Sequence, residues 1–243
     1  LNNVIVSTLN TGTKKANNAG ISQLGNYVVI QWDVTGSGTM QGTDVYSQSL
    51  VFQRKLHSSV SHQDMGIDAG GNEVMAYNIF VGSDRKPAMY RLDTGAVTDL
   101  MGSTAIEMAP SYHVSCRNID RPGWAYYSSA DGSDSANLPG RDQVWAIKLD
   151  GSGTVQVFAH AHHLMASNGA SNGYYSNPMA VPNRNGERVI FASEWNDDPD
   201  TGFIYSYLAQ KIGPAAPSGL TATTASSSQI NLTWTDNANN ETG

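Results

Sequence analysis

Four segments of this sequence share one pattern, in which a glycine in a turn precedes residues typical of a β-strand. The turn glycines are Gly25, Gly71, Gly123 and Gly186, and they lie 46, 52 and 63 residues apart. Asn-Gly between β-rich runs is a strong hairpin signal, because such turns need a positive φ that glycine adopts without strain. The clearest copy is the Asn185-Gly186 turn before the apolar run 188–193, with a further strand expected at 203–205. The chain is therefore expected to be a series of imperfect repeats of short strands.

A second turn signal recurs later in each repeat. It is Asn10-Thr11-Gly12, Asp93-Thr94-Gly95 or Asp150-Gly151, each between two strand-like stretches. One repeat thus contains four short antiparallel strands in about 45 residues, which is typical of a β-propeller blade. We predict an all-β fold with blades at 16–57, 58–107, 108–165 and 166–210, and the last two strands of a preceding blade at 1–15. Four and a half blades leave open edges, so we expect a longer precursor or other chains to complete the propeller.

The repeats resemble those of a known family. Residues 182–193, Pro-Asn-Arg-Asn-Gly-Glu-Arg-Val-Ile-Phe-Ala-Ser, resemble the TolB-type propeller repeat, whose usual form is His-Pro-x-x-Ser-Pro-Asp-Gly-x-x-Ile-x-Phe-x-Ser. Asn177 stands where that family often has His, and the matches at 62–77 and 113–127 are weaker. The resemblance implies the fold, because this repeat occurs in bacterial propellers of unrelated activities.

A second domain is predicted after a Pro-rich linker at 211–217. Residues 218–223 and 229–236 alternate apolar and polar residues, and the pattern Pro-x-x-Pro-x-x-Leu…Leu-x-Trp resembles the start of a fibronectin type III domain. The resemblance implies that Trp234 is the core tryptophan of that β-sandwich. Residues 218–243 supply only part of the ~100 residues that such a sandwich needs, so we expect this piece to be disordered or docked on another surface.

Composition limits the classes of partner. The net charge of −7 argues against nucleic acid, which requires clustered Lys and Arg. No run of residues is long and apolar enough for a membrane span. The abundance of Asn, Ser and Thr, the low Lys content and the single cysteine agree with an exported bacterial protein, extracellular or at the cell surface.

Equivalent positions before the turn glycines carry polar residues. Counting back nine or ten positions gives His62, His113 and Asn177. Because the first strand of each propeller blade lines the central channel, we expect these side chains to converge at one rim, where they could bind a polar ligand. The alternative is structural, with each side chain bonded to the backbone of a neighbouring blade.

The stretch from His113 to Arg117 suggests a chemical hypothesis. On a strand, His113 and Arg117 face the same side, since side chains alternate. Some secreted propellers of similar appearance are polysaccharide lyases, which need a group to neutralise the sugar carboxylate, a base and an acid. Arg117, His113 and one of Tyr112, Tyr174 or Tyr175, with Tyr174 preferred, could fill these roles. The alternative is that Arg117 pairs with an acidic residue and the tyrosines pack.

Two further candidates are a metal site and a sugar-stacking residue. His160 and His162 lie two positions apart, so on a strand they share a face and could hold a divalent metal, while His163 points the other way. A solvated His-rich loop is the alternative. Trp195 follows a strand in a polar loop and is the best candidate for stacking on a sugar.

Two functions follow from these patterns. One is a binding or structural scaffold for a glycan or an extracellular protein, which needs no catalytic motif. The other is a polysaccharide lyase acting on a uronic-acid polymer at the propeller rim. The chain begins with Leu and ends within a strand-rich segment, so we expect it to be part of a longer protein.

Overall fold

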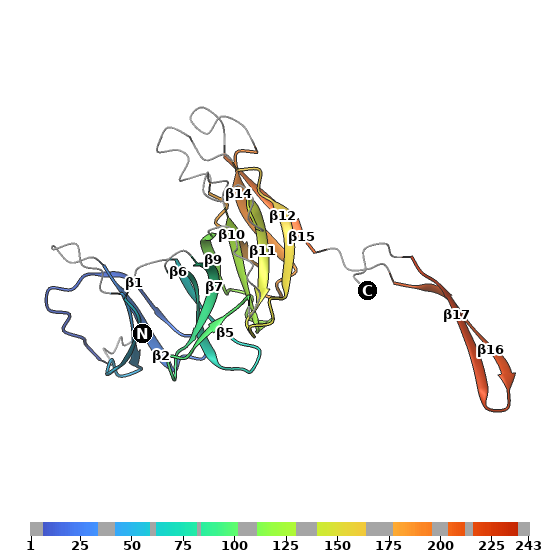
Figure 1. Cartoon of the computed structure of the whole chain (residues 1–243), viewed down its shortest axis with the longest axis horizontal. Helices are drawn as coiled ribbons and strands as arrows, with labels where there is room; N and C mark the ends of the chain where they lie inside the picture. The colour runs from blue at the N-terminus through green and yellow to red at the C-terminus, as the bar shows by residue number, and fades with distance from the viewer. Residues whose placement is uncertain are drawn as a thin grey trace, which may run out of the picture. The chain divides into compact units, whose positions relative to one another are not determined.

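The computed structural model of the chain describes residues 7–33, 42–58, 62–81, 84–101, 111–129, 140–163, 177–195, 204–211 and 216–237. The regular structure within these ranges consists of β-strands (Figure 1). None of the described segments forms a helix of the length and hydrophobicity needed to cross a membrane. The chain divides into two compact units, Leu1–Ala209 and Gln210–Gly243.

The first unit consists of four antiparallel sheets whose strands pair in chain order. The first sheet contains β1 (Ala16–Ile21), β2 (Tyr27–Trp32), β3 (Gly42–Ser47) and β4 (Phe52–His57). The second contains β5 (Gln63–Ile67), β6 (Glu73–Val81), β7 (Asp84–Arg91) and β8 (Val97–Asp99). The third contains β9 (Ser111–Ser115), β10 (Trp124–Ser129), β11 (Gln143–Lys148) and β12 (Val155–His160). The fourth contains β13 (Val181–Pro182), β14 (Arg188–Ser193) and β15 (Tyr205–Gln210). The first three sheets are four-stranded meanders typical of β-propeller blades, and the fourth has three strands within the described residues.

The turn glycines have the conformation that their sequence context predicts. Gly25, Gly71, Gly123 and Gly186 have φ values of 79°, 83°, 83° and 68° and join the first and second strands of the four sheets. At Gly186 there is a second requirement, because a side chain there would overlap the Tyr126 hydroxyl, which donates a hydrogen bond of 2.7 Å to the Gly186 carbonyl. This turn of the fourth sheet is thereby fixed against the third.

The core of the first unit lies between neighbouring sheets. One cluster joins the second and third sheets through residues such as Val74, Met89 and Trp145, and another joins the third and fourth through Val144 and Phe191. A further cluster joins the first and second sheets. Each blade therefore buries an apolar face against the next, as the alternation of side chains along its strands requires.

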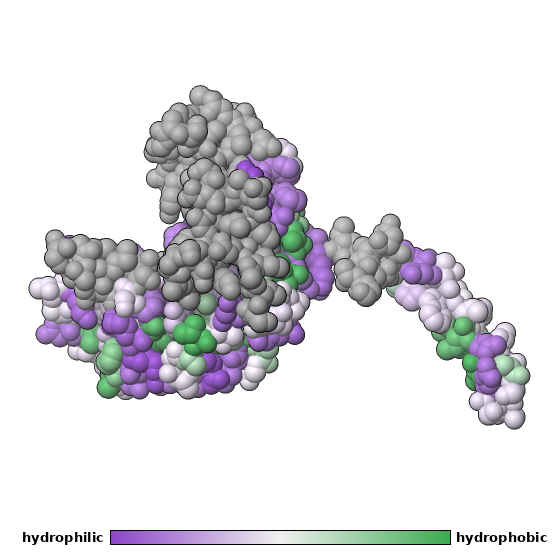
Figure 2. All heavy atoms as spheres, viewed as in Figure 1, coloured by the Kyte–Doolittle hydropathy of each residue, from purple (hydrophilic) through white to green (hydrophobic). Residues whose placement is uncertain are grey.

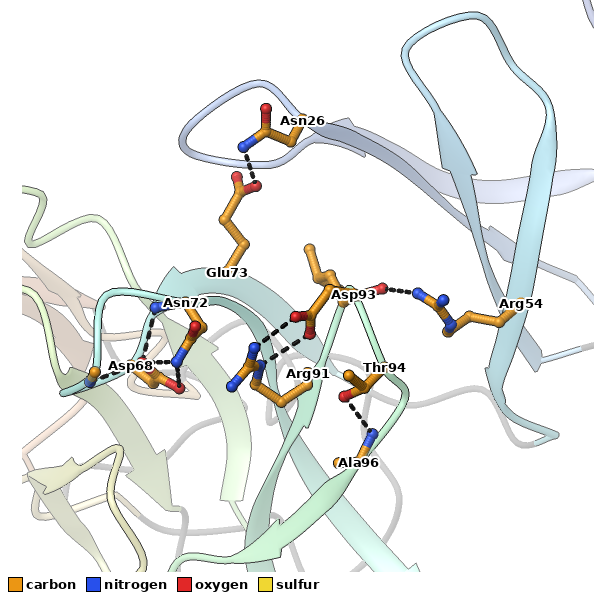
Figure 3. A network of polar contacts seen from close by, with 11 residues as sticks. Asn26, Arg54, Asp68, Asn72, Glu73, Arg91, Asp93, Thr94 and Ala96 are labelled. Carbon is orange, nitrogen blue, oxygen red and sulfur yellow. Dashed lines mark hydrogen bonds and ion pairs between the residues drawn. The ribbon is translucent and has the colours of Figure 1, made fainter.

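Polar contacts also join the blades near the glycine turns. Glu73 accepts a hydrogen bond from the Leu24 amide. It also accepts one from the Asn26 side chain, which is drawn in Figure 3. Arg54 donates to the Leu92 carbonyl. These contacts connect the first and second sheets at sites where a lost partner would leave a part-buried charge unsatisfied.

Two strand predictions differ from the structure. Residues 7–15 contain a turn and no strand, whereas Val4 to Val6 lies outside the described residues. The strand expected at 203–205 is β15, which begins at Tyr205 and continues to Gln210. For β15, local β-propensity placed the strand too early in the chain, because pairing with a neighbouring strand decides where a strand forms. The strand expected at Val4 to Val6 stays a prediction.

The second unit contains a β-hairpin of β16 (Ser218–Ser226) and β17 (Gln229–Thr235). The expectation of disorder in this segment is wrong for these residues, because backbone pairing alone orders both strands. The apolar side chains Leu220, Ile230, Leu232 and Trp234 are between 54% and 69% exposed, and apolar colour is visible along the hairpin in Figure 2. Trp234 therefore has no core around it within the described residues.

Candidate functional site

The strand registers place every histidine of the chain at one end of its blade. In the third sheet, Ser111 at the start of β9 pairs with Ser129, and Gln143 pairs with His160 at the end of β12. The same reasoning places His57, at the end of β4, at the end of the first sheet where β1 begins. All six histidines lie at or near the end of their blade where its first strand begins, and the turn glycines lie at the other end of the blade. We call these ends the histidine face and the glycine-turn face.

Two of the predicted rim residues are in contact. The imidazoles of His62 and His113 are stacked with ring centroids 4.5 Å apart, although 51 residues separate them in the sequence. Burial, together with the neighbouring His62, lowers the pKa of His113 to about 4. The stacked pair is therefore uncharged at His113 at neutral pH. Asn177, the third predicted rim residue, is buried with 4% of its surface exposed, which suits a structural role more than ligand contact.

The catalytic trio of His113, Arg117 and Tyr174 stays a prediction. Strand β9 ends at Ser115, so Arg117 lies beyond the region where side chains alternate and is exposed on a cavity with Asp64. The expectation that His113 and Arg117 share a strand face therefore fails, because it extended the alternation past the end of the strand. Tyr174 lies outside the described residues.

An aromatic cluster surrounds Trp195 on the histidine face. The indole stacks on Tyr207 with ring centroids 4.7 Å apart and an interplanar angle of 29°. The His162 ring centroid lies 4.3 Å from that of the indole at an interplanar angle of 45°, and the Tyr205 and Tyr207 centroids lie 6.4 Å apart. Trp195 is 48% exposed and Tyr205 is 53% exposed. We call Trp195, Tyr207, His162 and Tyr205 the aromatic platform.

A buried polar pair lies beneath the platform. His163 Nδ1 is 3.0 Å from both carboxylate oxygens of Glu194, and both side chains are fully buried. Because a carboxylate only accepts hydrogen bonds, Nδ1 carries the hydrogen and donates it. The His163 backbone amide donates to Asp142 at 2.8 Å, which ties the segment after β12 to the start of β11. These buried contacts fix Glu194 and His163, which are the chain neighbours of Trp195 and His162.

Backbone strain is concentrated at the same place. Asp142, His162 and Trp195 are non-glycine residues with φ values of 51°, 51° and 57°. Each costs of order 1–3 kcal/mol and persists only where surrounding contacts enforce it, which occurs most often at functional sites. The Trp195 amide donates to the Ser193 hydroxyl at 2.8 Å, and this contact helps to hold the indole outward.

The two predicted metal ligands, His160 and His162, lie near each other but do not form a complete metal site within the described residues. The rings of His160 and His162 have centroids 6.3 Å apart, and β12 ends at His160, so the two residues do not share a strand face. His163 is directed to Glu194 instead. Within the described ranges there is no group of three or more His, Cys, Asp or Glu side chains that could hold a metal ion. A metal at His160 and His162 stays a prediction.

Sequence reasoning found Trp195 but missed the residues that support it. Tyr207 and Glu194 come from β15 and the end of β14, and Glu194 meets His163 across 31 residues of chain. The one available signal was a glutamate placed immediately after an apolar strand, next to the only tryptophan expected in a loop.

Comparisons with known proteins agree with the propeller and go no further. No family model matches the sequence, and no curated protein matches it. Among solved structures, an oligogalacturonate lyase from Vibrio parahaemolyticus is similar with a TM-score of 0.49 and 13% identity, covering 76% of this chain and 46% of the lyase. A putative TolB from Agrobacterium tumefaciens is similar with a TM-score of 0.46 and 17% identity, covering 80% of this chain and 66% of that protein. This chain thus spans about half to two thirds of their lengths, and likeness at this level carries no argument about activity.

Proposed function

We propose that this protein is an extracellular or cell-surface β-propeller module that binds glycans through the aromatic platform. The observation that carries the proposal is Trp195, an indole that is 48% exposed and contacts Tyr207 and His162. Sugar rings present apolar C–H faces, which pack on exposed aromatic rings held in a fixed orientation. The strained backbone and the buried pair below supply that orientation before a ligand arrives, which lowers the entropic cost of binding.

Polar groups beside the platform complement this apolar surface. His160 is exposed at the end of β12, and His162 contacts Trp195 directly. Imidazoles donate and accept hydrogen bonds, as sugar hydroxyls require. An aromatic stacking surface with a few polar groups at its edge is the usual composition of a small-ligand site.

The test is a glycan-binding panel with matched tryptophan variants. Wild-type protein should retain one or more neutral or acidic polysaccharides in affinity electrophoresis, and Trp195→Ala should lower that affinity at least ~10-fold, which corresponds to about 1.4 kcal/mol. Trp234→Ala is the control, because Trp234 is also an exposed indole, at 61%, on the separate hairpin. Equal affinities of the two variants for every retained glycan would refute the platform as the binding surface.

The lyase alternative has weaker support. It needs a base and a carboxylate-neutralising group at one site, whereas the imidazole of His113 stacks on that of His62, and Arg117 lines the cavity with Asp64. A pKa of about 4 for His113 is also far below the value near the working pH that favours a general base. Ultraviolet absorbance of unsaturated products from uronate polymers tests this alternative, and turnover that is lost in His113→Ala would revive it.

The domain organisation is a proposal of the same kind. A propeller through residue 210, a Pro-rich linker at 211–217 and the start of a fibronectin type III module at 218–243 would suit a secreted modular protein. The hairpin of β16 and β17 supports this arrangement by its strand positions. Limited proteolysis that cleaves first within 211–217 is the expected result, and first cleavage inside β16 or β17 would count against it.

A further inference from the structure

A cavity of about 680 Å³ opens on the glycine-turn face, opposite the aromatic platform. It lies where the first strands of all four blades end, and its volume is in the range of sites for small molecules. The lining includes Ile21, Asp64, Arg117, Ile119, Val181 and Arg184. This cavity belongs neither to the proposed glycan site nor to the packed core between the blades.

Most polar groups of the cavity wall already have partners. The Gln23 side chain donates to the Met65 and Cys116 carbonyls at 3.1 and 2.6 Å, bridging three blades. Arg184 forms two hydrogen bonds, of 2.9 and 2.8 Å, with Asp120. These residues therefore shape the cavity and leave little capacity for a ligand.

Arg117 and Asp64 differ from the rest of the wall. Within the part of the chain that the structure describes, the Arg117 guanidinium makes no hydrogen bond or ion pair, so its five N–H donors face the cavity and solvent. Asp64 accepts one backbone hydrogen bond at each oxygen, from Met65 at 2.9 Å and from Cys116 at 2.8 Å. Each carboxylate oxygen can accept another. The cavity thus contains a cation and an anion that both have hydrogen-bonding capacity left.

The positive charge of Arg117 and the negative charge of Asp64 together disfavour a ligand that carries only an anionic group. Burial is the main influence on Asp64 and raises its pKa, although the two backbone N–H groups and the nearby Arg117 act in the opposite direction. A ligand bearing only a carboxylate would gain from Arg117 but meet the Asp64 carboxylate. A ligand that also carries an ammonium group would satisfy both, since opposite charges favour each other in a partly buried site.

The mouth of the cavity is apolar. Ile21 is 69% exposed and Ile119 is 46% exposed at its edge, and Val181 lies on the wall. Such side chains favour contact with an apolar group of a ligand over contact with water.

We propose that this cavity binds a short peptide or free amino acid with an apolar side chain, its carboxylate on Arg117 and its ammonium on Asp64. The side chain packs between Ile21, Ile119 and Val181. The site is independent of glycan binding, because it lies on the opposite face and shares no residue with the platform.

The test uses leucyl-leucine as the probe in isothermal titration calorimetry with the whole chain. Binding is expected, and Arg117→Gln should weaken it at least ~10-fold, because the neutral amide removes the charged hydrogen-bond donors that hold the ligand carboxylate. N-acetylation or C-terminal amidation of the dipeptide should each weaken it to a similar degree. Arg188→Gln is the matched control, because Arg188 is an exposed arginine on β14 outside the cavity and its loss should leave affinity unchanged.

Three results would overturn the proposal. They are no heat of binding with leucyl-leucine at millimolar concentration, equal affinity for capped and uncapped dipeptides, and equal losses in Arg117→Gln and Arg188→Gln. Binding of a galacturonate disaccharide that depends on Arg117, without dipeptide binding, would identify the cavity as an acidic-sugar site instead. Asp64→Asn completes the set, and if that variant fails to fold, Arg117→Gln and the capped dipeptides still decide the outcome.

Discussion

Replacing His163 by alanine tests whether the buried pair holds the histidine face together. Both His163 and Glu194 have no exposed side-chain surface, and the imidazole nitrogen lies 3.0 Å from each carboxylate oxygen. Removing the imidazole leaves the Glu194 carboxylate buried without this partner, which costs about 3 kcal/mol or more. For a unit of this size each kcal/mol shifts the Tm by about 2–4 °C, so a decrease of about 6–12 °C is expected.

The assay is thermal and urea unfolding, followed by the combined fluorescence of the five tryptophans. Glu194→Gln should cost less than His163→Ala, because the amide oxygen still accepts from the imidazole. Asp120→Ala is the control, since Asp120 pairs with Arg184 on the surface, where ion pairs contribute little. If His163→Ala melts within error of Asp120→Ala, the reasoning about the buried pair is wrong.

Three further predictions concern the blades and the rim. Gly186→Ala should destabilise the protein more than Gly71→Ala. Both positions need a positive φ, which costs alanine about 1–2 kcal/mol, but of the two only Gly186 has no room for a side chain, which would overlap the Tyr126 hydroxyl. Equal unfolding midpoints of the two variants would contradict this. Tyr126→Phe should lower the free energy of unfolding by about 1 kcal/mol, measured in urea, because the Gly186 carbonyl loses a buried donor. His113 takes up a proton more readily unfolded than folded, since its folded pKa is about 4 against 6.5, so stability should fall as pH decreases from about 6.5 to 4. His113→Gln should flatten that part of the pH–stability curve, and an unchanged curve would refute the assignment.

The fold could be predicted from the sequence at positions where the local residues determine the backbone conformation. The four turn glycines adopt positive φ in the structure, and β14 spans the predicted residues Arg188–Ser193. The contact of His62 with His113 was also predictable, because a repeat places equivalent residues on the same rim. In each case a short motif carried the information.

The site was less readable, because its contacts depend on where strands stop and on distant parts of the chain. Arg117 was misplaced since side-chain alternation does not reveal that β9 ends at Ser115. The pairing of His163 with Glu194 spans 31 residues and joins two blades. Neither propensity nor periodicity specifies which buried carboxylate meets which imidazole.

The two faces of the propeller differ in how freely their shape can change. On the glycine-turn face the connections, such as 68–72 and 183–187, span four to eight residues and are set by glycine turns. On the histidine face the sequence separation from β10, β12 and β14 to the next described strand is 13, 20 and 11 residues, whereas it is 5 residues after β4 and 2 residues after β6. Long connections tolerate substitution and insertion, whereas short turns with a required φ do not.

This asymmetry predicts different behaviour of the two proposed sites. The aromatic platform borders the long connections, so changes in those segments can alter glycan preference without disturbing the blades. The cavity is bounded by the ends of the first strands, so its volume is set by the packing between blades. Shortening the 161–180 connection by a few residues should therefore change glycan binding and leave leucyl-leucine affinity within twofold, whereas Gly186→Ala should affect dipeptide binding first. The opposite pattern would mean that the two faces are coupled through the blades and do not act as separate binding surfaces.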